Sequence, residues 1–232
     1  MIISHKYKFI FIKTSKTAGT SIEAFLAPHC GPKDVIVPPE GRRSPDPNTV
    51  RGQNYHGLWN VLREIRSRRG RRWYLSLFRF LCMRKFTSHM IARLVRERIS
   101  PEVWNSYFKF CVDRNPWDKT LSHYHMVCAR RGGNLTLDEY FREGKHAVNF
   151  GRYSDLEGNV IVDRVVKYES LNEELGEIFG QLGIPFDGTL GPRMKGAYRK
   201  DRRHYSEVLT PEQADRIAHL HAKEIEYHGY TF

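Results

Sequence analysis

Residues 9–23 read FIFIKTSKTAGTSIE, and this stretch decides the fold. It contains an apolar segment with strand character, a loop rich in Lys, Ser, Thr and Gly, and the start of a helix at about Ser21. In that order, the loop N–H groups and the positive end of the helix converge on one point, where a phosphate or sulfate group can bind. Lys16 adds a full positive charge, and Gly19 lets the backbone approach a ligand closely. The stretch therefore predicts an anion-binding loop after the first strand.

The loop differs from the nucleotide-triphosphatase loop, in which Gly is followed by four residues and then by Gly-Lys-Ser/Thr. Lys16 precedes Gly19 instead of following it, and no Gly opens the loop. Thr17 follows the lysine but is displaced from the setting in which it would hold magnesium. The loop therefore suits phosphate or phosphosulfate better than magnesium and ATP. An ordinary strand–turn–helix connection with a solvated lysine is the alternative interpretation of this run alone.

A second run, residues 108–125 (FKFCVDRNPWDKTLSHYH), repeats the same order of strand, polar turn and helix. Pro116 suits the first turn of the helix, where its missing N–H costs nothing. Arg114 lies at the strand end, and Ser122 follows on the helix. If the helix folds back over the strand end, the guanidinium fork and the hydroxyl can reach one phosphate. Taken alone, Arg114 could instead pair with a structural carboxylate.

Together the two runs resemble the sulfotransferase superfamily that uses 3′-phosphoadenosine 5′-phosphosulfate (PAPS), in particular its carbohydrate-sulfotransferase branch. Residues 15–21 (SKTAGTS) are similar to the 5′-phosphosulfate loop of that family, PKTAGTS, with Ser15 in place of Pro. Residues 112–118 (VDRNPWD), followed by Ser122, are similar to its 3′-phosphate motif, VRNPWD. Asp113 is an addition to that motif and is expected to put a negative charge next to the phosphate site.

The resemblance continues in the second half of the chain. Residues 159–169 look like a late hairpin of the family, and residues 198–232 look like its C-terminal region. The likeness implies one sulfotransferase domain over residues 1–232, with a P-loop-like α/β fold of the sulfotransferase and kinase type. The alternation of strands and helices independently favours a central parallel sheet flanked by helices, with the ligand at the carboxyl ends of its strands.

The resemblance also implies an activity. The protein would move the sulfuryl group of PAPS to an acceptor hydroxyl, expected on a carbohydrate, and release adenosine 3′,5′-bisphosphate without a metal ion. Two rival functions remain open: a P-loop nucleotide kinase-like phosphotransferase, and a non-catalytic module that binds nucleic acid or another polyanion. The first rival expects a lysine after the loop glycine, and the second leaves the paired loops unexplained. We therefore expect no nucleic-acid partner.

Sulfuryl transfer requires hydrogen-bond donors on the leaving side and a base on the attacking side. Lys16 is the predicted donor to the leaving oxygen. A charge pair at about 4 Å contributes roughly 4 kcal/mol at an effective dielectric constant of about 20. The predicted base is His89, which follows a Lys/Ser context like that of relatives, and His56 is the second choice. Asp118 or Glu23 would serve only with a raised pKa.

The resemblance further implies the residues that hold the nucleotide. Arg114 and Ser122 are expected on the 3′-phosphate, the loop is expected on the 5′ side, a late basic segment is expected to close over the nucleotide, and a tyrosine is expected to stack on adenine. The predicted cofactor-binding set is Lys13, Thr17, Ala18, Gly19, Thr20, Ser21, Arg114, Ser122, Arg193, Lys195, Tyr198 and Arg199.

Composition limits the class of protein. Of the 232 residues, 40% are hydrophobic and 28% are charged, no apolar run is long enough to span a membrane, and the strand near the N-terminus leaves no room for a signal peptide. We therefore expect a cytoplasmic enzyme. Cys30, Cys82, Cys111 and Cys128 form neither a Cys-x-x-Cys pair nor a zinc pattern, so we expect reduced thiols, although spacing leaves a disulfide open.

The net charge of +12 points to anionic partners. Part of it comes from a dense arginine cluster in residues 63–72. This cluster is either a solvated face or a surface for a polyanionic acceptor, a nucleic acid or an acidic membrane, and the sequence does not choose between them.

Overall fold

The computed structural model describes residues 1–37, 86–144, 146–191, 198–199, 201 and 203–232. Three residues of the predicted site lie outside this part of the chain: His56, Arg193 and Lys195. The arginine cluster in residues 63–72 and Cys82 also lie outside the described residues.

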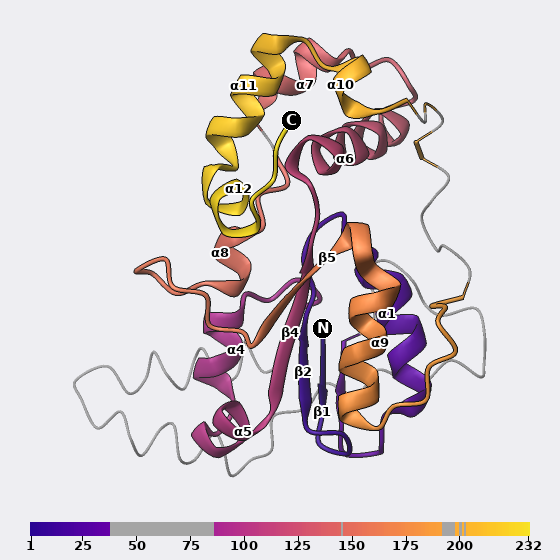
Figure 1. Cartoon of the computed structure of the whole chain (residues 1–232), viewed down its shortest axis with the longest axis vertical. Helices are drawn as coiled ribbons and strands as arrows, with labels where there is room; N and C mark the ends of the chain where they lie inside the picture. The colour runs from indigo at the N-terminus through magenta and orange to yellow at the C-terminus, as the bar shows by residue number, and fades with distance from the viewer. Residues whose placement is uncertain (38–85, 145, 192–197, 200, 202) are drawn as a thin grey trace.

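A five-stranded sheet forms the centre of the protein (Figure 1). Its order is β3 (Val35–Ile36), β1 (Ile2–Ser4), β2 (Phe9–Ile12), β4 (Phe108–Asp113) and β5 (Arg164–Lys167). β2, β4 and β5 pair in parallel, whereas β1 is antiparallel to both β2 and β3. The prediction of a parallel sheet is therefore confirmed for these three neighbours and wrong for β1. The tight connection between β1 and β2 reverses the chain too quickly for a parallel crossover.

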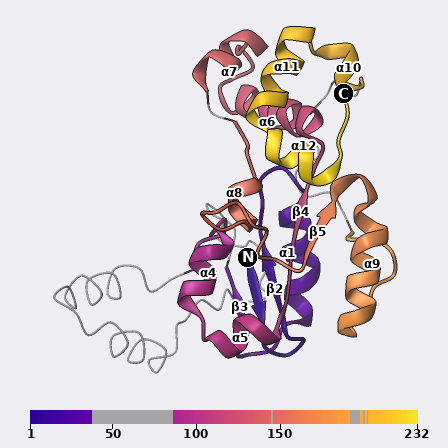
Figure 2. The same cartoon turned by 60° about the vertical axis from the view of Figure 1, so that its left-hand side comes forward.

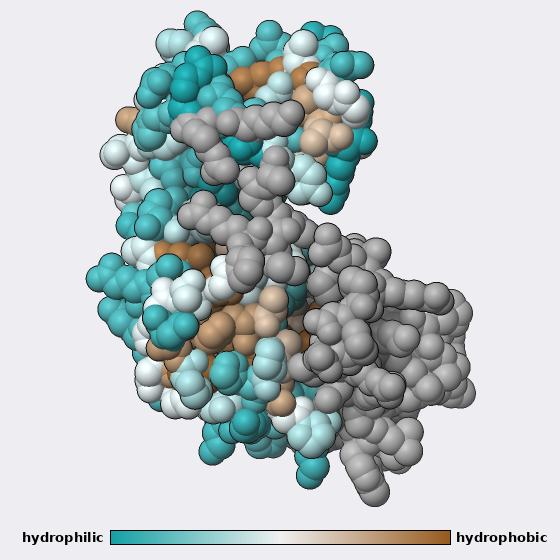
Figure 3. Space-filling view, turned by 90° about the vertical axis from the view of Figure 1, so that its right-hand side faces the viewer, coloured by the Kyte–Doolittle hydropathy of each residue, from teal (hydrophilic) through white to brown (hydrophobic). Residues whose placement is uncertain are grey.

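The strands are buried on both faces because apolar side chains alternate between two cores. Ile10 and Ile12 of β2 pack on one face with Val95 and Trp104. These two belong to α4 (Ala92–Arg98) and α5 (Pro101–Ser106), which cover that face. Phe9 and Phe11 of β2 belong to the opposite core. That core contacts α1 (Gly19–Leu26) and α9 (Leu171–Leu182), and on this side of the molecule an apolar area lies among hydrophilic surroundings (Figure 3).

A third core lies beyond the carboxyl ends of β2 and β4, in a group of helices (Figures 1 and 2). Trp117 and Leu121 of α6 pack there against Tyr140 of α7 and Ile217 of α11. The group contains α6 (Pro116–Arg130), α7 (Leu137–Glu143), α10 (Tyr205–Val208), α11 (Pro211–Leu220) and α12 (Ala222–His228). The other elements of the described residues are η1 (Ala27–His29), α8 (Phe150–Tyr153) and η2 (Tyr168–Ser170).

Several predicted elements have different limits in the structure. Helix α1 begins at Gly19, two residues before the predicted start. The predicted hairpin in residues 159–169 is wrong: β5 pairs with β4, and only an isolated bridge joins Ser154 to Val160. The C-terminal helical region is divided into α11 and α12 at His221. The break turns the His221 ring into the interior, where Nδ1 lies 3.3 Å from Oε1 of Glu224.

The described residues include no helix that combines the length and the apolar character needed to cross a bilayer. Within the same residues, Cys30, Cys111 and Cys128 are free thiols, and Cys111 is buried in β4.

Candidate functional site

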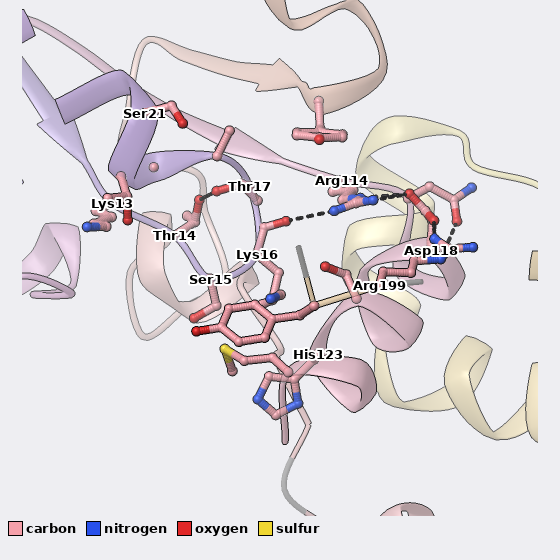
Figure 4. Close-up of a pocket in the computed structure, with 18 of the residues that line it drawn as sticks. Lys13, Thr14, Ser15, Lys16, Thr17, Ser21, Arg114, Asp118, His123 and Arg199 are labelled. Carbon is pink, nitrogen blue, oxygen red and sulfur yellow. Dashed lines mark hydrogen bonds and ion pairs between the residues drawn. The ribbon is translucent and has the colours of Figure 1, made fainter. Parts of the chain in front are cut away.

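The two predicted anion-binding corners meet at one cavity of about 810 Å³ (Figure 4). One corner joins β2 to α1, and the other joins β4 to α6. They face each other because β2 and β4 are parallel neighbours, with Ile12 opposite Cys111. Nη1 of Arg114 donates to the carbonyl of Lys16 across the junction at 3.3 Å. A cavity of this size is within the usual range for organic ligands, roughly 300–1,000 Å³.

Every predicted site residue within the described part of the chain lines this cavity. These residues are Lys13, Lys16, Thr17, Ala18, Gly19, Thr20, Ser21, His89, Arg114, Ser122, Tyr198 and Arg199. The structure thus brings together side chains from the first loop, from the segment before α4, from α6 and from the late basic segment.

The first loop has the backbone shape of an anion-binding nest. Lys16 and Ala18 adopt left-handed conformations, with φ of 62° and 58°. Left-handed backbone conformations are uncommon in residues other than glycine, and those that occur are concentrated at functional sites. Within the described residues, no group accepts from the N–H groups of Thr17, Ala18, Gly19 and Thr20. Successive unpaired N–H groups at the start of a helix are the arrangement that binds anions.

Gly19 has a packing role in addition to any ligand contact. A Cβ atom at this position would lie 2.8 Å from Cγ of Lys13, closer than side chains tolerate. Lys13 is buried, and its amino group forms an ion pair with Glu23 on α1. Any ligand contact of Lys13 therefore competes with this internal partner.

A buried polar network supports the loop from behind. The Asn149 side chain accepts from the Ser15 N–H at 2.9 Å and donates to the Ser15 carbonyl at 3.1 Å. It also donates to Asp113 at 3.0 Å. Asp113 is fully buried and forms an ion pair with Lys119 at 2.8 Å. The expectation that Asp113 places its charge beside the phosphate site is therefore wrong, because its carboxylate turns into the interior and is compensated there.

Arg114 is held by the first turn of α6. Its Nε donates to Oδ2 of Asp118 at 2.7 Å, and its guanidinium lies 4.2 Å from the centre of the Tyr168 ring. Asp118 also forms an ion pair with Arg199. Burial raises the pKa of Asp118, but the charges and hydrogen bonds of the two arginines outweigh it, and the net effect is a lowered pKa. Asp118 therefore lacks the raised pKa that a general base would need.

Two of the histidines that line the cavity, His89 and His123, lie in different electronic settings. Nδ1 of His89 lies 3.3 Å from the Lys13 carbonyl. A carbonyl can only accept, so Nδ1 carries the proton and Nε2 keeps a lone pair. Nδ1 of His123 lies 2.8 Å from the hydroxyl of Tyr140. Burial is the main cause that lowers the pKa of each histidine to about 4, so both rings are neutral at pH 7.

Other cavity residues were not predicted, although two of them continue a helical spacing that is visible in the sequence. Met126 and Arg130 continue the four-residue spacing of Asp118 and Ser122, so the four side chains share one face of α6. The remaining unpredicted residues of the cavity come from separate segments, so their convergence could not be read from spacing. They are Thr14, Ser15, Ser88, Asn115, His123, Tyr168, Glu169, His204 and Tyr205, while Arg203 belongs to the late basic segment that was expected near the nucleotide.

The described residues contain no group of three or more His, Cys, Asp or Glu side chains placed to hold a metal ion. No protein-family model matches the chain, and no solved structure matches it. A protein of Archaeoglobus fulgidus, described as uncharacterized, is 31% identical over 118 residues, which cover 48% of this chain and 98% of that protein. The chain belongs to the same family as this archaeal protein. The description of the archaeal protein names no activity, so the chemistry must be argued from the geometry of the site.

Proposed function

We propose that this protein is a PAPS-dependent sulfotransferase, which transfers a sulfuryl group to a hydroxyl of an acceptor, expected to be a carbohydrate. One observation carries the proposal: two strand-to-helix corners, each equipped for an anion, open on the same cavity. The donor PAPS has two anionic groups on its ribose, a phosphate at the 3′ position and a phosphosulfate at the 5′ position, so a protein that holds both needs two such corners. The motifs at the corners are those that resemble the sulfotransferase superfamily.

The residues present fit the donor. The N–H groups of Thr17, Ala18, Gly19 and Thr20, which have no acceptor among the described residues, would hold the 5′-phosphosulfate. Arg114 and Ser122, which line the same cavity, would hold the 3′-phosphate. When bound, PAPS supplies an activated sulfuryl group on a phosphate leaving group.

The protein's own residues then have two tasks. Lys16 stabilises the negative charge that develops on the leaving side, and a lysine charge can do this without a metal ion. His89 accepts the proton of the attacking hydroxyl at Nε2, because Nδ1 is committed to the Lys13 carbonyl. The lowered pKa of His89 keeps the ring unprotonated, which is the form that a base requires. Anionic groups bound nearby would raise this pKa toward the range in which a base is most effective.

Thermal unfolding with added ligands tests the proposal. Adenosine 3′,5′-bisphosphate at about 100 times its dissociation constant should stabilise the protein by roughly 2.7 kcal/mol. For a chain of this size the corresponding rise in Tm is about 5–10 °C. Magnesium should not be needed. A kinase-like phosphotransferase would instead respond to ATP with magnesium, and a polyanion-binding module would respond to neither nucleotide.

Matched variants locate the binding site. Arg114→Ala should abolish most of the shift, because hydrogen bonds from a charged group to phosphate are the strong ones. Arg131→Ala is the control, since Arg131 pairs with Glu143 on the surface and lies outside the cavity. Sulfate transfer is then measured by mass spectrometry of candidate acceptors. Lys16→Ala should lower turnover by about three powers of ten, the rate equivalent of roughly 4 kcal/mol. Wild-type turnover in this variant would exclude Lys16 from the mechanism.

A further inference from the structure

His123 lies on α6 immediately after Ser122 and lines the cavity near the loop. Figure 4 shows its ring on the same side of the loop as the Lys16 side chain. The two groups are close enough for the charge of Lys16 to lower the pKa of His123. His123 therefore lies in the same cavity as the anion-binding loop, and its role there depends on which ring nitrogen carries the proton.

The partner of Nδ1 decides the tautomer. Nδ1 of His123 lies 2.8 Å from the hydroxyl of Tyr140, a side chain on α7 that is only 2% exposed. Within the described part of the chain, the Tyr140 hydroxyl has no other hydrogen-bond partner. A buried donor left unpaired costs about 1–3 kcal/mol. The hydroxyl therefore donates to Nδ1, and the single proton of the neutral ring is on Nε2.

We propose that His123 is a neutral hydrogen-bond donor, which presents Nε2–H to the anionic group bound at the Lys16 loop and does not remove a proton from the acceptor. The identity of that group as phosphosulfate rests on the proposed function. His89 has the opposite arrangement, because its Nδ1 donates to a carbonyl and its Nε2 has a lone pair. His123 and His89 would thus serve opposite purposes, the first as a hydrogen-bond donor and the second as a base.

The surroundings of His123 keep it neutral. Burial is the largest influence, and Lys16 on the loop, His146 before α8 and Arg130 on α6 all act in the same direction. Together they lower the pKa of His123 to about 4. A neutral donor already aimed at the position of developing charge needs no rearrangement during reaction. Loss of one such donor typically costs about 10²–10³ in kcat.

Two substitutions at this position separate a donor from a base. His123→Gln keeps an N–H group near the position of Nε2 but cannot accept a proton, whereas His123→Leu offers neither function. We expect His123→Leu to lower kcat by about 10²–10³ and His123→Gln to remain within about tenfold of the wild type. His125→Leu is the control on the same helix, because His125 does not line the cavity. Equal losses in the Gln and Leu variants would overturn the assignment.

Nitrogen NMR of the histidine rings tests the tautomer without requiring activity. The wild-type protein should show the Nε2–H tautomer of His123, with no titration between pH 5.5 and pH 8. A proton on Nδ1, or titration within that range, would overturn the proposal. If the wild type neither binds adenosine 3′,5′-bisphosphate nor transfers sulfate, the proposed function fails, and the NMR result still decides whether His123 presents a donor.

Discussion

Replacement of Lys119 by methionine should be among the most destabilising single changes in this protein. The Lys119 amino group is fully buried and lies 2.8 Å from Asp113 and 3.3 Å from Glu224. Burial raises the pKa of Glu224, but the hydrogen bond from His221 and the charge of Lys119 outweigh it and lower that pKa to about 2. Without the lysine, two buried carboxylates lose their shared cation.

The expected loss is about 3–5 kcal/mol, the usual result of removing one partner of a buried ion pair. The value should fall toward the lower end, because Asp113 keeps hydrogen bonds from Tyr153 and Asn149. In thermal unfolding the loss corresponds to a Tm lower by about 6–20 °C. Urea unfolding followed by tryptophan fluorescence measures the same quantity, since Trp117 lies in the adjacent core.

Arg131→Met is the matched control. Arg131 pairs with Glu143, but the two side chains are 44% and 34% exposed, so the loss should be about 0–1 kcal/mol. If Lys119→Met lowers the free energy of unfolding by less than about 1 kcal/mol, the ion pairs of Lys119 with Asp113 and Glu224 do not stabilise the protein as described. If the variant fails to fold, the triple variant with Asp113→Asn and Glu224→Gln, which removes all three charges, should recover folding. A triple variant that also fails would contradict the electrostatic explanation.

Three further changes have defined outcomes. Gly19→Ala should cost about 1–3 kcal/mol by overpacking against Lys13, and urea unfolding equal to wild type would contradict this. Thr136→Ala removes the capping box of α7 and should cost about 1 kcal/mol without changing nucleotide affinity in calorimetry. Between pH 6.5 and about pH 4, His89 and His123 bind protons in the unfolded chain but not in the folded protein. The free energy of unfolding should therefore decrease as the pH is lowered through this range. Urea midpoints that do not change in this range would refute the pKa assignments.

The sequence was most informative where structure and chemistry depend on neighbouring residues. Both strand–loop–helix corners could be predicted, because each combines an apolar run, a polar turn and a helix start within a short segment. β1 was missed since Ile2–Ser4 is too short to show a periodic pattern. Asp113 was misjudged because its partner Lys119 is reached only after α6 has formed.

Other features of the site and of the fold could not be predicted because they depend on contacts between residues far apart in the sequence. Asn149 contacts a loop residue 134 positions away, and no local pattern marks it. His221 interrupts the last helix because it reaches Glu224 in the interior, while the surrounding sequence has ordinary helical character. The proton position on His123 depends on Tyr140, which a different helix supplies.

The two hydrogen bonds between the Asn149 side chain and the Ser15 backbone have a consequence for ligand affinity. One amide side chain satisfies both the N–H and the carbonyl of Ser15, so this end of the loop loses its freedom when the chain folds. A ligand that binds later does not have to order that segment again, and its affinity is not reduced by that entropy. The backbone N–H of Asn149 is in turn bonded to Glu224 on α12. Changes at the C-terminal helix that loosen Asn149 would therefore weaken binding at a loop they never touch.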